Sequence, residues 1–197
     1  MTTLIAADIF GATPELQGFA IALDGDVLVT AASDHPLPPG QSEAQAYAAF
    51  IAAGGVAAYV ARLRKRLEDP GLAIDRVIGF SAGATALWTL LATPAAAHLR
   101  SATLFYGSRI RDAADLEPRC PVKLIFAEQE SAFDPAALVA ALKARGLDAA
   151  IEPGSRHGFM NERSSGFDPA LYRRHLAALR LDAGSTSRPS DRRREPR

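Results

Sequence analysis

Residues 76–91 have the sequence RVIGFSAGATALWTLL, in which a short β-branched run precedes a longer helix-like run. The first run predicts a strand over Arg76–Phe80, and the second predicts a helix over Ala82–Leu91. Between them stands Gly79-Phe80-Ser81-Ala82-Gly83, a G-x-S-x-G pattern whose small residues allow a sharp turn that lifts the serine hydroxyl to the top of the sheet. The helix start behind Ser81 presents backbone N–H groups to the same place. The stretch therefore predicts a nucleophile elbow.

Strands and helices alternate on both sides of this stretch. The apolar pattern predicts strands Leu4–Ile9, Val27–Ala31, Ala102–Tyr106, Val122–Phe126 and Ala149–Glu152, and helices Pro14–Leu23, Glu43–Leu67, Pro135–Ala144 and Pro169–Leu179. The helix Glu43–Leu67 is weakened at Gly54-Gly55. Such alternation implies right-handed crossovers and a mostly parallel sheet. We therefore predict one α/β domain over residues 1–182, a compact α/β-hydrolase fold in which a single doubly wound sheet carries helices on both faces and no large lid.

Length and charge limit the classes of protein to which the chain can belong. It has 197 residues, enough for one full-sized core, and 48% of them are hydrophobic, which argues against a disordered chain. Lys and Arg together number 22, as do Asp and Glu, so the formal net charge is zero. That balance gives no support to a nucleic-acid or membrane-surface binder. We expect a monomer or homodimer whose partner is a small molecule.

Cysteine content and the N-terminus bear on the cellular compartment. Cys120 is the single cysteine, which excludes an intramolecular disulfide and a cysteine zinc cluster. No secretory signal is visible at the N-terminus, so a cytoplasmic location is expected. The uncharged stretch Val77–Ala97 is long enough to cross a bilayer, but its glycines, hydroxyl residues and proline favour strand, turn and helix. Residues 183–197 contain five arginines and no large apolar side chain, which predicts a disordered basic tail.

Two further polar positions follow predicted strands, at the edge where open α/β sheets bind ligands. His157 lies in a loop directly after one strand, so its ring can reach the serine of a neighbouring strand and accept a proton. Glu130 follows another strand and is the favoured carboxylate to orient the imidazole. Glu128 and Asp134 remain alternatives for that acid, although Asp134 also fits a helix N-cap. His175, on the last predicted helix, is expected at the surface.

Four segments, in chain order, resemble the dienelactone hydrolase family of the α/β-hydrolase superfamily. Asp8-Ile9-Phe10-Gly11 looks like the family's loop after the first strand, and Gly79-Phe80-Ser81-Ala82-Gly83 looks like its nucleophile elbow. Phe105-Tyr106-Gly107 looks like the end of its following strand, and His157-Gly158-Phe159-Met160-Asn161 looks like its histidine loop. The resemblance covers most of residues 4–181. It implies a catalytic triad of Ser81, Glu130 and His157, and an oxyanion hole formed by the backbone N–H groups of Ile9 and Ala82.

Three positions depart from the family's pattern. Serine stands at position 81 where the best-known members have cysteine, Glu130 stands where aspartate is usual, and Asp8 stands where the family has glutamate. Because a serine hydroxyl depends on its base more than a thiol does, we expect serine esterase chemistry. Weaker candidates for substrate contacts are Asp8, Phe10, Tyr106, Arg109, Phe159 and Arg163.

The sequence thus predicts a serine hydrolase that cleaves a small ester or lactone through an acyl-enzyme intermediate. No cofactor or metal is required, because a side chain supplies the nucleophile. A dienelactone substrate is not assumed, since no arginine immediately follows Gly158-Phe159 to match the family's carboxylate-binding arginine; Arg109 and Arg163 are only candidates for that role. Two alternatives stay open: a non-catalytic, hydrolase-like module that binds a small molecule, and acyl transfer to an alcohol or amine.

Overall fold

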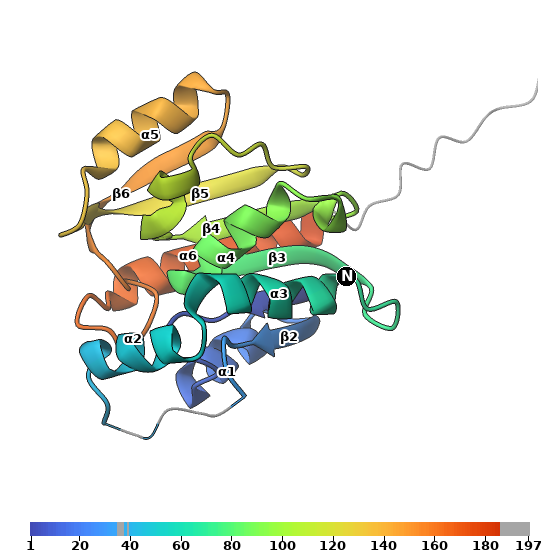
Figure 1. The fold of residues 1–197 in the computed structure, drawn as a ribbon, viewed down its shortest axis with the longest axis horizontal. Coiled ribbons are helices and arrows are strands. Elements are labelled where there is room, and N and C mark those ends of the chain that lie inside the picture. Colours follow the sequence, from blue (N-terminus) through green and yellow to red (C-terminus); the bar gives the residue numbers. More distant parts are fainter. Residues whose placement is uncertain (35–37, 39, 186–197) are drawn as a thin grey trace, which may run out of the picture.

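The chain folds around one parallel sheet. The computed structural model describes residues 1–34, 38 and 40–185, with side chains through Asp182. Within these residues six strands pair in the order β2-β1-β3-β4-β5-β6, and each neighbouring pair is parallel. They are β1 (Thr2–Ala6), β2 (Asp26–Thr30), β3 (Ile74–Phe80), β4 (Ser101–Phe105), β5 (Val122–Gln129) and β6 (Asp148–Arg156). The predicted doubly wound α/β sheet is confirmed (Figure 1).

Helices cover both faces of the sheet because side chains alternate along each strand. In β1, Leu4 and Ala6 belong to one buried cluster, whereas Ile5 belongs to the other. The first cluster is closed by α2 (Glu43–Ala52), α3 (Gly55–Leu67), α4 (Ala82–Leu91), α5 (Pro135–Ala144) and the short turns η1 (Pro94–Ala96) and η2 (Ser108–Ala113). The second is closed by α1 (Pro14–Ala22) and α6 (Pro169–Ser185).

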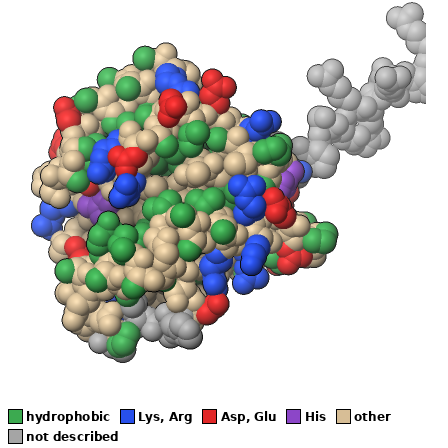
Figure 2. All heavy atoms as spheres, in the orientation of Figure 1, with side chains coloured by type: hydrophobic (Ala, Val, Ile, Leu, Met, Phe, Trp, Pro, Cys, Tyr) green, Lys and Arg blue, Asp and Glu red, His purple; other side chains and the backbone are tan. Residues whose placement is uncertain are grey.

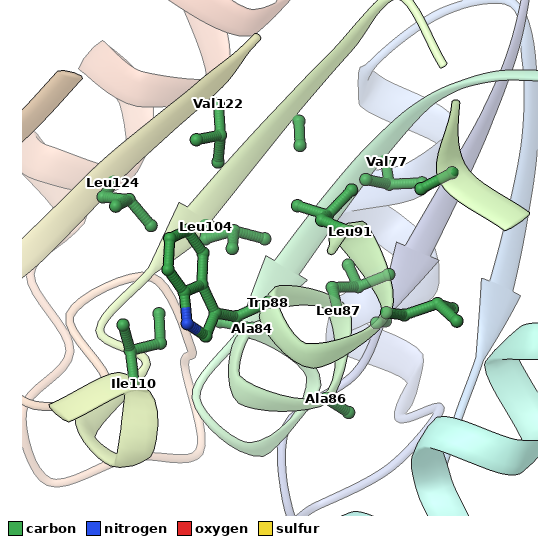
Figure 3. Close-up of a cluster of buried hydrophobic side chains, with 14 of the residues drawn as sticks. Val77, Ala84, Ala86, Leu87, Trp88, Leu91, Leu104, Ile110, Val122 and Leu124 are labelled. Carbon is green, nitrogen blue, oxygen red and sulfur yellow. The ribbon is translucent and has the colours of Figure 1, made fainter. Parts of the chain in front are cut away.

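Helix α4 is enclosed by the first cluster. Of its residues, all but Thr89 are buried. Trp88 lies among Leu104, Leu124 and Ile110 (Figure 3), and its indole N–H donates a hydrogen bond to the Ala113 carbonyl at 2.8 Å. A helix packed in this way cannot shift without opening the core, so the residue at its start has a fixed position.

That residue is Ser81, at the sharp turn between β3 and α4. Its φ of 48° lies in the left-handed region, and its N–H donates to the Phe105 carbonyl at 3.0 Å. The turn requires two close backbone approaches. A Cβ at Gly79 would lie 2.7 Å from the Ala84 Cα, and a Cβ at Gly83 would lie 2.3 Å from the Ala6 carbonyl oxygen. Both glycines of the pattern are therefore needed for packing.

Every predicted strand is present, although β1 ends at Ala6 and not at the predicted Ile9, because residues 7–9 leave the sheet in a turn. Helices α4 and α5 have the predicted bounds, while β5 and β6 run several residues longer than predicted. The single helix predicted over Glu43–Leu67 is wrong, because α2 and α3 are separate helices at an angle of 70°. Gly54 and Gly55 have φ values of 96° and 59°, a conformation that ends a right-handed helix.

The structure also bears on the predicted C-terminal boundary and on the stretch considered as a membrane span. Helix α6 continues to Ser185, past the predicted domain end at residue 182, while residues 186–197 of the predicted tail lie outside the described part. In the described residues no single helix is long and apolar enough to cross a membrane; only α2 and α3 taken together reach those limits, across their bend. Acidic and basic side chains are intermixed on the face drawn in Figure 2.

His175 is not at the surface, contrary to the sequence-based expectation. Its side chain is 14% exposed, and its Nε2 lies 2.7 Å from Oε2 of the buried Glu152. The ring also packs edge-on against Phe105, with centroids 5.2 Å apart. Burial lowers the pKa of His175, an effect that outweighs the opposite influence of the Glu152 carboxylate. Because the adjacent residues Arg173 and Arg174 are charged, the local sequence around His175 is typical of an exposed helix face.

Gly83→Ala is expected to destabilise the fold, because the new methyl group would overlap the carbonyl oxygens of Ala6 and Ala7. Overpacking of this kind costs about 1–3 kcal/mol, measurable as a lower midpoint of urea unfolding. Gly18→Ala in α1 is the matched control. It has open space around it and should leave stability unchanged or raise it by about 0.5–1 kcal/mol. Equal midpoints for the two variants would contradict the packing argument.

The lowered pKa of His175 predicts a pH dependence of stability. Below about pH 6.5 the unfolded chain takes up a proton at this residue that the folded chain resists, so stability is lost as the pH falls. His175→Asn removes this titration and keeps a hydrogen-bond donor. Between pH 7.5 and 5.5 the parent should lose more free energy of unfolding than the variant, by at most about 1.4 kcal/mol per pH unit. Parallel pH profiles would show that His175 does not contribute.

Candidate active site

The structure brings Ser81, His157 and Glu130 together at the carboxyl edge of the sheet. Ser81 follows β3, Glu130 follows β5 and His157 directly follows β6. Ser81 Oγ lies 2.9 Å from His157 Nε2, and His157 Nδ1 lies 2.8 Å from Glu130 Oε1. The Glu130 side chain is 5% exposed, whereas that of His157 is 38% exposed. With the proton on Nδ1 donated to Glu130, Nε2 is free to accept the serine proton.

The two alternative acids have other hydrogen-bond partners. Glu128 Oε2 accepts the Gly154 N–H at 2.8 Å, and so links β5 to an irregular part of β6. Asp134 caps α5 by accepting the Ala136 N–H at 2.9 Å. Glu130 is therefore the carboxylate, among the three considered, that faces the imidazole.

Two backbone N–H groups bear on the expected oxyanion hole. The Ala82 N–H is the first of α4 and has no acceptor within its helix. The close contact of Gly83 with the carbonyls of Ala6 and Ala7 places the end of β1 against this helix start. Ile9 follows two residues later, and no described residue accepts its N–H. These are the two amides expected to form an oxyanion hole.

The weaker candidates for substrate contacts have different surroundings. Tyr106 and Phe159 are wholly buried, and Tyr106 packs edge-on against His157, with centroids 5.1 Å apart. Arg109 pairs with Asp112 at 2.9 Å. Arg163 lies over the Phe10 ring, 5.8 Å from its centroid.

Sequence reasoning did not find two side chains that connect the site's loops. Glu43, the first residue of α2, accepts hydrogen bonds from Ser164 Oγ at 3.0 Å and from the Ser165 N–H at 2.9 Å. Burial raises the pKa of Glu43, but these bonds outweigh that effect and lower it overall. Asn161 donates to the buried Asp8. Both contacts join residues more than a hundred positions apart, which no local pattern reveals.

Two hollows involve candidate site residues, one lined by Ile9 and the other by His157 and Glu130. One of about 270 Å³ is largely apolar, and Ile9, Phe10, Phe50 and Ala49 are among the residues that line it. The other, of about 460 Å³, is open and polar, and its lining includes His157, Glu130, Arg156 and Gln129. A larger hollow of about 940 Å³ lies at the opposite edge, beside the first residues of β4, β5 and β6, and contains none of the triad. In the described part of the chain, no group of three or more His, Cys, Asp or Glu side chains could hold a metal ion.

Known proteins with a similar structure are α/β hydrolases. A dienelactone hydrolase-like promiscuous phosphotriesterase from metagenomic libraries superposes with a TM-score of 0.68 at 16% identity, over 93% of this chain and 85% of that one. Est1E from Butyrivibrio proteoclasticus superposes with a TM-score of 0.60 at 12% identity, over 93% and 87%. Mouse alpha/beta hydrolase domain-containing protein 10 gives 0.64 at 10% identity, over 94% and 90%. At these identities the likeness establishes the fold alone.

Sequence comparison gives a more specific result. The uncharacterized protein YczH of Bacillus subtilis (strain 168) is 36% identical over 114 residues, which is 57% of this chain and 55% of that protein. The chain thus spans about half the length of this relative. The sequence model of the dienelactone hydrolase family matches residues 52–180, well over half of the chain. The matched residues include three of the four motif segments, while Asp8-Ile9-Phe10-Gly11 lies outside them. The predicted family is confirmed, and this chain belongs to the dienelactone hydrolase family.

Proposed function

We propose that the protein is a serine hydrolase that cleaves small carboxylic esters or lactones. The observation that carries this proposal is the continuous hydrogen-bond chain from Ser81 through His157 to Glu130. Membership in a hydrolase family supports it. A serine hydroxyl is a weak nucleophile unless a base takes its proton, and the contact with His157 supplies that base.

The proposed reaction has two halves. Ser81 Oγ attacks the substrate carbonyl carbon while its proton passes to His157 Nε2, and Glu130 stabilises the imidazolium. The carbonyl oxygen gains negative charge and accepts hydrogen bonds from the Ile9 and Ala82 amides. The C–O bond then breaks, and His157 gives its proton to the leaving oxygen. Water, deprotonated by His157, finally attacks the acyl-enzyme and releases the acid and Ser81.

The two hollows suggest how an ester would lie. Because His157 must protonate the leaving oxygen, the alcohol part of the substrate belongs on the polar, open side that His157 lines. The acyl part then extends past the Ile9 amide toward the apolar hollow. This arrangement favours a short apolar acyl group joined to a polar alcohol.

Ser81→Ala should lower turnover of a p-nitrophenyl ester by at least about 10⁴-fold, since it removes the nucleophile. Glu130→Gln should lower it by about 10²- to 10⁴-fold, because the imidazole loses its orienting charge. Glu128→Gln is the matched control and should retain parent turnover, since Glu128 contacts Gly154 and not the imidazole. Parent-like turnover by Ser81→Ala would contradict the assignment of the nucleophile.

Covalent labelling separates catalysis from simple binding. A fluorophosphonate probe should attach to Ser81 of the parent protein, as detected by mass spectrometry of the labelled peptide. Failure of both labelling and ester turnover would favour the alternative of a non-catalytic binding module. Product analysis with an added alcohol acceptor would reveal acyl transfer.

Acyl-chain length tests the apolar hollow. Ala49→Leu fills part of the hollow, so kcat/KM for butyrate should fall about 10-fold or more relative to acetate, an amount typical of lost apolar burial. Ala48→Leu, one position along α2, is exposed and does not line the hollow, so it should leave the butyrate-to-acetate ratio unchanged. Equal ratios in all three proteins would place the acyl group elsewhere.

A further inference from the structure

A hydrogen bond joins the two loops that hold opposite sides of the proposed site. Asp8 lies in the loop after β1, one residue before Ile9, and Asn161 lies four residues after His157. The Asn161 side-chain amide donates to Asp8 Oδ2. The Asp8 side chain is buried, and the bond joins residues 153 positions apart in the sequence.

Asp8 also forms hydrogen bonds with the two residues that follow Ile9. Asp8 Oδ1 accepts the Phe10 N–H at 2.9 Å, and the Asp8 carbonyl accepts the Gly11 N–H at 3.1 Å. Ile9 therefore lies within a short turn whose two ends are tied to Asp8. The direction of the Ile9 N–H depends on that turn.

The Asn161 end is equally fixed. Its side-chain oxygen accepts the Arg163 N–H at 2.8 Å, which orients the NH₂ group toward Asp8. Its backbone N–H donates to the Gly158 carbonyl at 2.8 Å, closing a tight turn directly after His157. A displacement of Asn161 would therefore move the segment that carries His157.

Burial makes the link costly to break. Removal from water raises the pKa of Asp8 overall, although the bonds from Asn161 and Phe10 act in the opposite direction by stabilising the carboxylate. A buried carboxylate that lost one of these donors would keep its desolvation penalty without compensation.

We propose that Asp8 and Asn161 are positioning residues, which hold the Ile9 amide and the His157 loop in register for the transition state. The inference rests on the proposed function, because it assigns these residues a part in the same reaction. An amide that binds the developing oxyanion acts on the transition state more than on the bound substrate. Loss of the link should therefore lower kcat about 10- to 10²-fold and change KM little.

Exchange of the two side chains tests the link directly. In Asp8→Asn one amide oxygen faces two donors, the Phe10 N–H and the Asn161 NH₂, so one donor is left against an NH₂ group. In Asn161→Asp two carboxyl groups face each other, and each single variant should therefore lose kcat. The double variant Asp8→Asn, Asn161→Asp restores one donor and one acceptor with the direction of the bond reversed. In it, the oxygen of the new amide still accepts from Phe10, and the new carboxylate still accepts from Arg163. The double variant should recover kcat to within about 5-fold of the parent.

The Tm of each variant is measured beside kcat, so that a loss of stability can be distinguished from a loss of positioning. Single variants that lower Tm but keep the parent kcat would overturn the inference, as would a double variant that recovers Tm but not kcat. If the exchanged proteins do not fold, Asn161→Ala removes the bond without repulsion, and a parent-like kcat in that folded variant overturns it. Ser81→Ala is measured in parallel. If Ser81→Ala also retains turnover, the proposed function fails, whereas an inactive Ser81→Ala beside unaffected link variants rejects the positioning role alone.

Discussion

Helix α4 begins where it does because position 83 has no side chain. The Gly83 backbone lies against the Ala6 and Ala7 carbonyls, closer than any Cβ would allow, and Gly79 makes the same kind of approach to Ala84. These contacts bring the end of β1 and the start of α4 together, which is what the proposed oxyanion hole of Ile9 and Ala82 amides requires. The buried surface of α4 then holds Ser81 in its strained conformation.

A series of aromatic contacts joins the His157 imidazole to helix α6, on the face of the sheet opposite to α4. His157 packs on Tyr106, Tyr106 packs on Phe159, and Phe159 packs on His175 of α6. His175 is in turn hydrogen-bonded to the buried Glu152 of β6. Tyr106 and Phe159 belong to segments that resemble the family's motifs. In this structure both are buried and pack in series behind His157, so they support the imidazole. The last helix thus contributes to the site without touching it.

Local patterns in the sequence were sufficient for the sheet, most of its helices and the candidates Ser81 and His157, while they left Glu128 and Asp134 open beside Glu130 as the acid. The elbow is recognisable because Gly79, Ser81 and Gly83 fall between a β-branched run and a helical run. The break at Gly54-Gly55 was underestimated, because glycine tolerates a helix interior and its positive φ depends on tertiary packing. The contact between Asp8 and Asn161 and the inward face of His175 arise from chain segments distant in sequence, so periodicity could not reveal them.

The strand that begins the described chain, β1, lies between β2 and β3, one strand in from the edge of the sheet, and its partners come from distant parts of the sequence. β1 pairs with β3, some seventy residues later, and Ile5 and Ile78 share their buried cluster with Leu179 of α6. A nascent chain that has not yet produced α6 leaves this face of the sheet only partly covered, and such exposed apolar surface invites aggregation or chaperone binding. The elbow between β3 and α4 and the loop of His157 both precede α6 in the chain, so α6 is synthesised after both of them.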